Sequence, residues 1–231
     1  GPGARPRARP VTAMDVAAAD LPERDLYKLL VNTVLPRPIA LVTSCDRAGR
    51  VNAAPFSFFN VFSHAPPLVV LGIEGREGQE PSKDTLRNIR ETGGFVVNLV
   101  DRALVPAMTV CGIDFPPEVE ELAMAGLATL PSRTVSAPRI AASQGQFECR
   151  ERVSLGLGTR HRTLVVGEIV HLWIRDGLVD GRGHVDVDAL DLVGRLHGAD
   201  WYVTTRDRFR EPRKTRADLE AGAAAPPEKK P

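Results

Sequence analysis

Residues 38–60 read PIALVTSCDRAGRVNAAPFSFFN, and this stretch decides the fold class. Residues 38–44 are mostly apolar or β-branched, which is typical of a buried strand. The turn-forming residues Asp46 and Gly49 follow, and apolar sequence resumes at Val51. The pattern predicts a β-hairpin whose second strand begins at Val51.

The rest of the central sequence has the same character. Further runs rich in Val, Leu and Ile, bounded by Gly or Pro, predict strands at residues 68–73, 94–100, 146–157 and 163–174. Helical patterns are scarcer, and they predict short helices at residues 82–91, 104–110 and 118–125. Because the strands do not alternate with helices, we expect a mainly β fold with short helices, either a barrel or a sandwich.

The composition narrows the class of protein. The chain has 231 residues, with 30 Lys and Arg against 29 Asp and Glu, and 43% of its residues are hydrophobic. This balance is typical of a globular protein and favours no nucleic-acid partner. No apolar run approaches the ~20 residues that cross a bilayer, and the first residues lack a signal-peptide core. We therefore expect a cytoplasmic protein without a membrane partner.

One domain is expected, at residues 21–210. Residues 1–20 and 211–231 offer little apolar surface to offset the entropy of ordering, so they are predicted to be flexible tails. The cysteines Cys45, Cys111 and Cys149 lie far apart without a CxxC pair. They predict buried thiols and neither a disulfide framework nor a zinc site.

Several common enzyme motifs are absent. The sequence contains no GxxxxGK[ST] loop, no HExxH helix and no GxSxG elbow. Residues 156–161, GLGTRH, begin like a dinucleotide fingerprint, but His161 replaces the third glycine and no convincing helix follows. The five histidines include no pair at i, i+4 spacing that would bind zinc on a helix. We expect neither a Rossmann domain nor a metal.

Three polar segments suggest a ligand site. In residues 52–60, NAAPFSFFN, small side chains would let a flat ligand approach the backbone, although a bulged strand with Phe residues in the core explains the segment equally well. In residues 82–85, SKDT, a helix start with Lys83 could bind phosphate, whereas plain capping accounts for Ser82 and Asp84. Residues 194–202, GRLHGADWY, combine Gly, Arg, His and aromatic side chains, and His197 is either a ligand contact or a structural residue.

In order and spacing, seven segments of this sequence resemble the flavin reductase-like family. They are PRPIALVTS at 36–44, NAAPFSFFN at 52–60, SKDTLRNIRETGGFVVNLV at 82–100, GLATLPSRTVSAPRI at 126–140, FEC at 147–149, LVVGEIVHLWI at 164–174 and GRLHGADWY at 194–202. Together they extend over about residues 25–210. The resemblance implies an FMN-binding split β-barrel, usually a homodimer with the flavin at or near the subunit interface.

The same resemblance assigns roles to individual residues. Those expected along the isoalloxazine ring and ribityl chain are Asn52, Ala53, Ala54 and Ser57. Those expected to hold the FMN phosphate are Ser82, Lys83 and Thr85. His197 falls in the segment that lines the flavin from the other side. Shorter relatives carry Gly-Asp-His where this chain has Thr159, Arg160 and His161, so His161 is either a nicotinamide contact or a surface histidine.

The function implied by the resemblance is hydride transfer from NADH or NADPH to FMN. In such a reaction the flavin carries the chemistry and the protein orients two rings. No general acid is required, and His161 and His197 remain the catalytic candidates. Reduced FMN would then leave for a partner monooxygenase or meet oxygen directly. The alternative is a non-catalytic electron carrier or flavin-storage protein that keeps its FMN.

Overall fold

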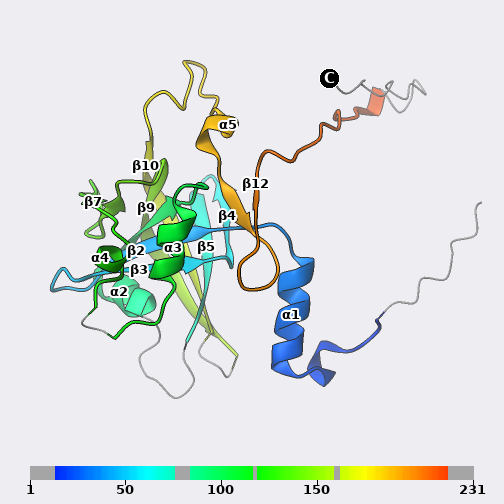
Figure 1. Cartoon of the computed structure of the whole chain (residues 1–231), viewed down its shortest axis with the longest axis horizontal. Coiled ribbons are helices and arrows are strands. Elements are labelled where there is room, and N and C mark those ends of the chain that lie inside the picture. Colours follow the sequence, from blue (N-terminus) through cyan, green and yellow to red (C-terminus); the bar gives the residue numbers. More distant parts are fainter. Residues whose placement is uncertain (1–13, 76–83, 117–118, 159–161, 218–231) are drawn as a thin grey trace, which may run out of the picture.

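The computed structural model describes residues 14–75, 84–116, 119–158 and 162–217 (Figure 1). Its helices are the 3-10 turn η1 (Ala18–Asp20) and the α-helices α1 (Glu23–Thr33), α2 (Asp84–Thr92), α3 (Val105–Cys111), α4 (Glu121–Met124) and α5 (Val187–Leu190). Its strands are β1 (Arg37–Pro38), β2 (Ala40–Cys45), β3 (Val51–Phe56), β4 (Phe59–His64), β5 (Pro67–Glu74), β6 (Gly94–Leu99), β7 (Thr129–Leu130), β8 (Arg139–Ile140), β9 (Gly145–Leu157), β10 (Arg162–Ile174), β11 (Val193–Arg195) and β12 (Tyr202–Thr204).

The main sheet confirms the predicted hairpin and the mainly β class. Seven strands lie in the order β3-β2-β6-β9-β10-β5-β4. β2 and β3 are antiparallel neighbours, with Thr43 opposite Ala53. β5, β6, β9 and β10 correspond to the other predicted strands, and β10 joins β5 to β9.

The sheet closes into a split barrel because its two edge strands are consecutive in the sequence. β3 and β4 lie at opposite edges, yet only Ser57 and Phe58 connect them. In a flat sheet of seven strands the edges would be about 29 Å apart, whereas two linking residues reach about 10 Å. The sheet must therefore curl, and the amide of Gly72 on β5 donates to the carbonyl of Phe58 at 2.7 Å.

The interior of the barrel is packed with apolar side chains. Phe95, Leu71 and Ile73 are among the largest fully buried side chains, and α2 contributes Leu86 and Ile89. Packing here is close enough to require a glycine, because a Cβ built on Gly167 of β10 would lie 2.4 Å from the ring of Phe95. These contacts pack β10 against the side chain of Phe95 from β6 inside the barrel.

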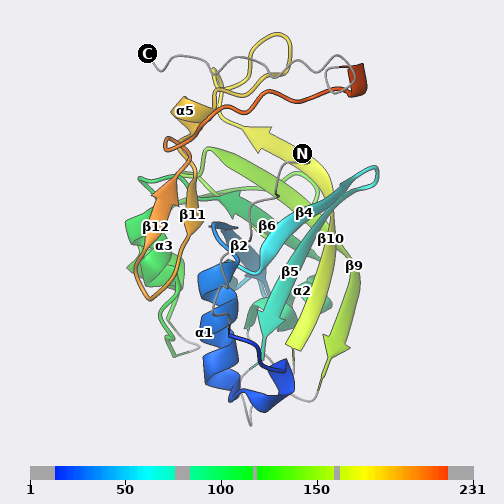
Figure 2. The same ribbon diagram turned by 90° about the vertical axis from the view of Figure 1, so that its right-hand side faces the viewer.

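A second apolar cluster covers the outer face of β2 and β3. Met108 and Cys111 of α3 and Leu122 of α4 pack there against Leu41 and Ala53. The three-stranded sheet β1-β11-β12 continues this layer. Figure 2 shows α1 and the β11–β12 hairpin on the same side of the barrel, where they form the walls of the site.

Three features differ from the sequence-based expectation or were not foreseen by it. α1 was not predicted, and only Val31 in this helix is buried. β4 was included in one polar segment with β3, and the structure separates them at Ser57. The alternative interpretation of that segment is partly confirmed, because Phe56 and Phe59 belong to the core. The buried state predicted for Cys45, Cys111 and Cys149 is confirmed.

Membrane-spanning helices and metal-binding clusters were considered for the described part of the chain. None of its helices is both long and apolar enough to span a membrane. Within these same residues no group of three or more His, Cys, Asp or Glu side chains is arranged to hold a metal ion.

Candidate functional site

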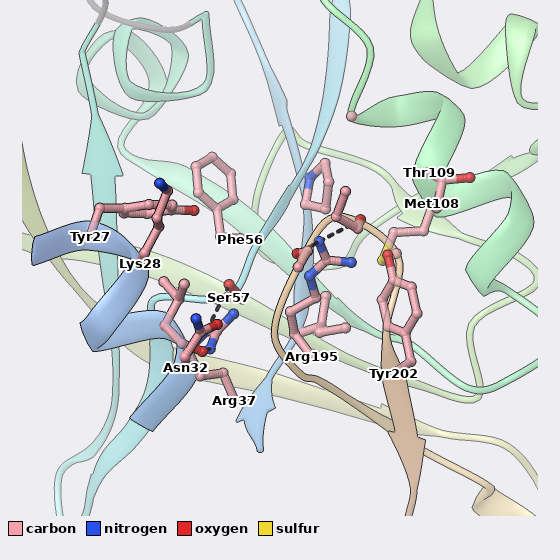
Figure 3. Close-up of a pocket in the computed structure, with 16 residues that line it drawn as sticks. Tyr27, Lys28, Asn32, Arg37, Phe56, Ser57, Met108, Thr109, Arg195 and Tyr202 are labelled. Atoms are coloured by element: carbon pink, nitrogen blue, oxygen red, sulfur yellow. Dashed lines mark hydrogen bonds between the residues drawn. The ribbon is translucent and has the colours of Figure 1, made fainter. Parts of the chain in front are cut away.

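A cleft of about 880 Å³ lies at the end of β3 (Figure 3). One wall is α1, with Tyr27, Lys28 and Asn32, and the opposite wall is α3 together with the β11–β12 hairpin. In Figure 3 the side chains of Tyr27 and Lys28 lie on one side, those of Arg195 and Tyr202 on the other, and Phe56 lies between them. A cleft of this size with aromatic walls suits a planar organic ligand.

The floor of the cleft is the point where the barrel closes. Pro55, Phe56 and Ser57 of the β3–β4 junction line it. β3 is an edge strand, so every second peptide group of its outer edge has no strand partner. Where no side chain covers them, the backbone groups of such an edge can donate to or accept from a flat molecule.

Arg37 holds the walls of the cleft to its floor. Its side chain is buried and donates to the carbonyl oxygens of Val31 at 2.6 Å and Val34 at 3.1 Å, at the end of α1. It also donates to the carbonyl of Leu196 at 3.1 Å in the β11–β12 hairpin, and to the hydroxyl of Ser57 at 3.3 Å. One guanidinium therefore fixes three separate segments around the same opening.

The electrostatic character of the cleft is positive. Lys28, Arg37 and Arg195 line it, and none of the described lining residues carries a carboxylate. Burial lowers the pKa of Arg37, Tyr27 opposes this effect, and the like charge of Arg195 adds to it. An arginine stays protonated under such conditions, so the cleft attracts anions.

A second polar cluster lies at the other end of β3, beside the first turn of α2. The side-chain amide of Asn52 donates to the hydroxyl of Thr85 at 2.8 Å. One turn later on α2, Asn88 is buried and donates to the hydroxyl of Ser44 at 3.2 Å. The side-chain oxygen Oδ1 of Asn88 has no hydrogen-bond partner among the described residues. The start of α2 adds backbone N–H groups and a positive dipole end, as an anion site requires.

The structure places the predicted site residues in two groups. Ser57 lines the cleft, whereas Asn52 and Thr85 lie about 17 Å away along β3, five residues at the usual rise of a strand. The side chain of Ala53 is buried in one apolar cluster, and the partly buried side chain of Ala54 packs against the other. Ser82, Lys83 and His161 lie outside the described residues.

His197 lies in the β11–β12 hairpin beside the cleft, and it is not among the residues that line it. Its ring stacks on Trp201, with centroids 6.0 Å apart and planes 15° apart. Both rings are exposed. In this arrangement His197 is a residue of the rim.

Comparison with known proteins identifies the family. The model of the flavin reductase like domain matches residues 32–187, more than half of the chain. The chain belongs to this family. An uncharacterized protein of Halalkalibacterium halodurans is 41% identical to it over 185 residues, which are 78% of this chain and 88% of that protein.

Solved structures extend the likeness. Nitrilotriacetate monooxygenase component B from Bacillus cereus has a TM-score of 0.82 at 29% identity, over 87% of this chain and 100% of that one. The 2-nitrobenzoate 2-nitroreductase of Pseudomonas fluorescens has a TM-score of 0.79 at 37% identity, over 88% and 98%. These likenesses confirm the predicted flavin reductase-like split barrel.

The matched range also shows which parts of the cleft lie outside the family domain. Tyr27 and Lys28 of α1 precede residue 32, and Arg195 and Tyr202 follow residue 187. The floor and α3 lie within the domain. Of the cations in the cleft, Lys28 and Arg195 therefore lie outside the matched range, and the buried Arg37 lies inside it.

Sequence reasoning missed most of the residues that line the cleft. Arg37 lies in the quoted segment at 36–44, and a charged residue next to a buried strand is the signal that could have revealed it. Tyr27 and Lys28 were missed because α1 itself was not predicted. Arg195 and Tyr202 belong to the segment at 194–202, for which the sequence predicted a ligand contact at His197 only.

The donor chemistry of the site fits a flavin that carries a phosphate. A ring can lie against the exposed edge of β3 at Ser57, and a phosphate can reach the Asn52–Thr85 pair and the N-terminus of α2 at the other end. The unpartnered oxygen of Asn88 marks the polar end of this track.

Proposed function

We propose that this protein binds FMN and transfers a hydride to it from NADH or NADPH. The observation that carries the proposal is the combination of a cleft with aromatic walls at Ser57 and a hydroxyl–amide pair at the start of α2, joined by one edge strand. Membership of the flavin reductase-like family supports the oxidoreductase class.

Each part of the chain has a task in this proposal. Thr85, Asn52 and the first turn of α2 would hold the phosphate, together with Ser82 and Lys83 from the adjoining sequence. The backbone of residues 53–57 would orient the ring, and Arg37 would keep the two walls at a fixed separation. Bound FMN supplies the hydride-accepting chemistry, so the protein contributes positioning and exclusion of water.

We further propose that the working unit is a homodimer. Val61 and Phe62 of β4 and Leu172 of β10 are large apolar side chains that are each more than half exposed, and contact with a second copy would cover them. The likeness to a monooxygenase component B supports delivery of reduced flavin to a partner monooxygenase. The higher identity to a nitroreductase favours a second candidate function, direct reduction of a nitroaromatic acceptor.

The test begins with the protein purified without added flavin. When FMN is added, the fluorescence of the flavin should change on binding at micromolar protein. The rate of NADH or NADPH oxidation should exceed the background given by free FMN. Unchanged flavin fluorescence would refute FMN binding. Bound FMN without any nicotinamide oxidation would favour the electron carrier or flavin store over the reductase.

The phosphate assignment has its own test. Lys83→Ala should weaken FMN by about tenfold or more and leave riboflavin unchanged, because only FMN carries a phosphate. Arg90→Ala is the matched control, since Arg90 is an exposed cation in the last turn of the same helix. Equal losses of FMN and riboflavin in Lys83→Ala would assign Lys83 to the fold instead.

A further inference from the structure

The three cations of the cleft are not equivalent. Arg37 is committed to protein acceptors, since its three nitrogens bond three carbonyls and the Ser57 hydroxyl. Lys28 is paired with Asp25 at 3.4 Å, between side chains that are 55% and 54% exposed, a contact that contributes little. Lys28 can therefore turn toward a ligand in the cleft at small cost.

On the opposite wall, contacts with the protein fix the position of the Arg195 side chain. One of its terminal nitrogens donates to the carbonyls of Gly198 at 2.9 Å and Ala199 at 2.6 Å. The centre of its guanidinium group lies 4.8 Å from the centre of the Tyr202 ring. These contacts fix the plane of the guanidinium and leave its other nitrogens for an acceptor in the cleft.

We propose that Lys28 and Arg195 make the cleft specific for a planar second ligand that carries a negative charge, the molecule that meets the flavin. This rests on the proposed function. The proposed phosphate position of FMN is about 17 Å away at Thr85, so the cations at the ring end serve another ligand. The aromatic rings of Tyr27 and Tyr202 supply faces for a planar molecule.

Both cations come from segments outside residues 32–187 that match the family domain. Residues within the matched range thus supply the flavin track, and Lys28 and Arg195 choose the second ligand. Two sources offer the required anion: a carboxylate on a planar acceptor and the phosphates of the nicotinamide dinucleotide. Both present the same chemistry to Lys28 and Arg195.

The experiment compares benzoate with benzamide, which have the same shape and differ in charge. Each is titrated into the FMN-loaded protein, and binding is followed by the change in the visible absorbance of the bound flavin. We expect benzoate to bind about tenfold more tightly at low salt, and added salt to remove the difference. Benzamide should not respond to salt.

Variants assign the effect to the cations. Lys28→Gln should weaken benzoate by about three- to tenfold and leave benzamide unchanged. Arg24→Gln removes the same charge from α1 at a position that does not line the cleft, and it should affect neither ligand. Arg195→Lys keeps the charge but loses the planar fork, so it should weaken benzoate as well. A parallel rise in the KM for NADH in Lys28→Gln would identify dinucleotide phosphate as a second source of the anion.

Three results would overturn the proposal. Equal binding of benzoate and benzamide by FMN-loaded protein would remove its basis while leaving the proposed function intact. Equal effects of Lys28→Gln and Arg24→Gln on benzoate would show a general field and no specific contact. A changed reduction potential of bound FMN with unchanged benzoate affinity would assign the cations to the flavin. If the protein binds no FMN, the proposed function itself is refuted, and that result is distinct from the three above.

Discussion

Glu148 of β9 is a buried carboxylate whose removal should have a measurable and pH-dependent cost. It is wholly excluded from solvent. Its oxygens accept hydrogen bonds from the backbone N–H of Arg133 at 2.9 Å, from the N–H and hydroxyl of Thr134 at 2.7 and 2.6 Å, and from the indole of Trp173 at 2.7 Å. These bonds attach the segment before β8 to the outer face of the sheet.

The contribution of Glu148 to stability follows from its pKa. Burial alone would raise the pKa of Glu148, but the Thr134 hydroxyl, the Arg133 N–H and the Trp173 indole together lower it to about 2. An unfolded glutamate has a pKa of about 4.3, so the ionised form stabilises the fold by roughly 3 kcal/mol above pH 5. Because the folded pKa is the lower one, this contribution is lost as the pH falls from about 4.5 toward 2.

Glu148→Gln keeps the shape and removes the charge. Its amide group would place N–H donors against the donors of Thr134, so we expect the free energy of unfolding at pH 7 to fall by about 3 kcal/mol. The difference from the parent protein should shrink to below about 1 kcal/mol near pH 2.5. Urea unfolding followed by circular dichroism at pH 7, 5, 4 and 2.5 measures both values.

The control is Glu168→Gln on the neighbouring strand β10. Glu168 forms an ion pair with Arg152, whose side chain is 61% exposed, so its loss should cost less than about 1 kcal/mol. Subtracting the free energy of unfolding of the parent protein at each pH cancels the titration of all other carboxylates. A Glu148→Gln difference that stays constant from pH 7 to 2.5, or is below 1 kcal/mol throughout, would refute the reasoning.

Other predictions concern the site and the assembly. Arg37→Lys keeps the charge but cannot reach four acceptors, so urea unfolding should show a loss of about 1–3 kcal/mol and FMN titration a weaker complex; unchanged values for both would contradict the clamp. His161→Ala and His197→Ala should each leave the stopped-flow rate of hydride transfer within about tenfold, and a loss of several decades with flavin bound would make an imidazole catalytic. Light scattering should give a dimer, whereas 25.0 kDa at every concentration would exclude it.

The strands of the barrel could be predicted because each is a long run of apolar and β-branched residues. β9 and β10 extend over thirteen residues each and were located within one residue at both ends. The closure of the barrel can also be explained from the sequence, but only when the strand order is known. The short link at Ser57 and Phe58 has this consequence once β3 and β4 are known to be opposite edges.

The helix α1 could not be recognised from its pattern. An amphipathic helix is found by apolar residues at 3- to 4-residue spacing that are buried on one face. Here Leu29 and Leu30 are adjacent and both exposed, and Val31 is the only buried residue of the helix. α1 is held instead by polar contacts, such as the 2.9 Å ion pair between Glu23 and Arg162 of β10. Contacts between residues so distant in sequence leave no local pattern.

Arg37 shows why the site was harder to predict than the fold. Three of its four acceptors are backbone carbonyls, of Val31, Val34 and Leu196. A carbonyl oxygen is present at every residue, so nothing in the side chains at these positions marks them as partners of an arginine. Of the groups in these hydrogen bonds, only the Arg37 side chain can be recognised in the sequence. The signal in the sequence was therefore a single Arg before a buried strand. Its role depended on the antiparallel pairing of β1 with β11, which sets Arg37 opposite Arg195 and brings the carbonyl of Leu196 within reach.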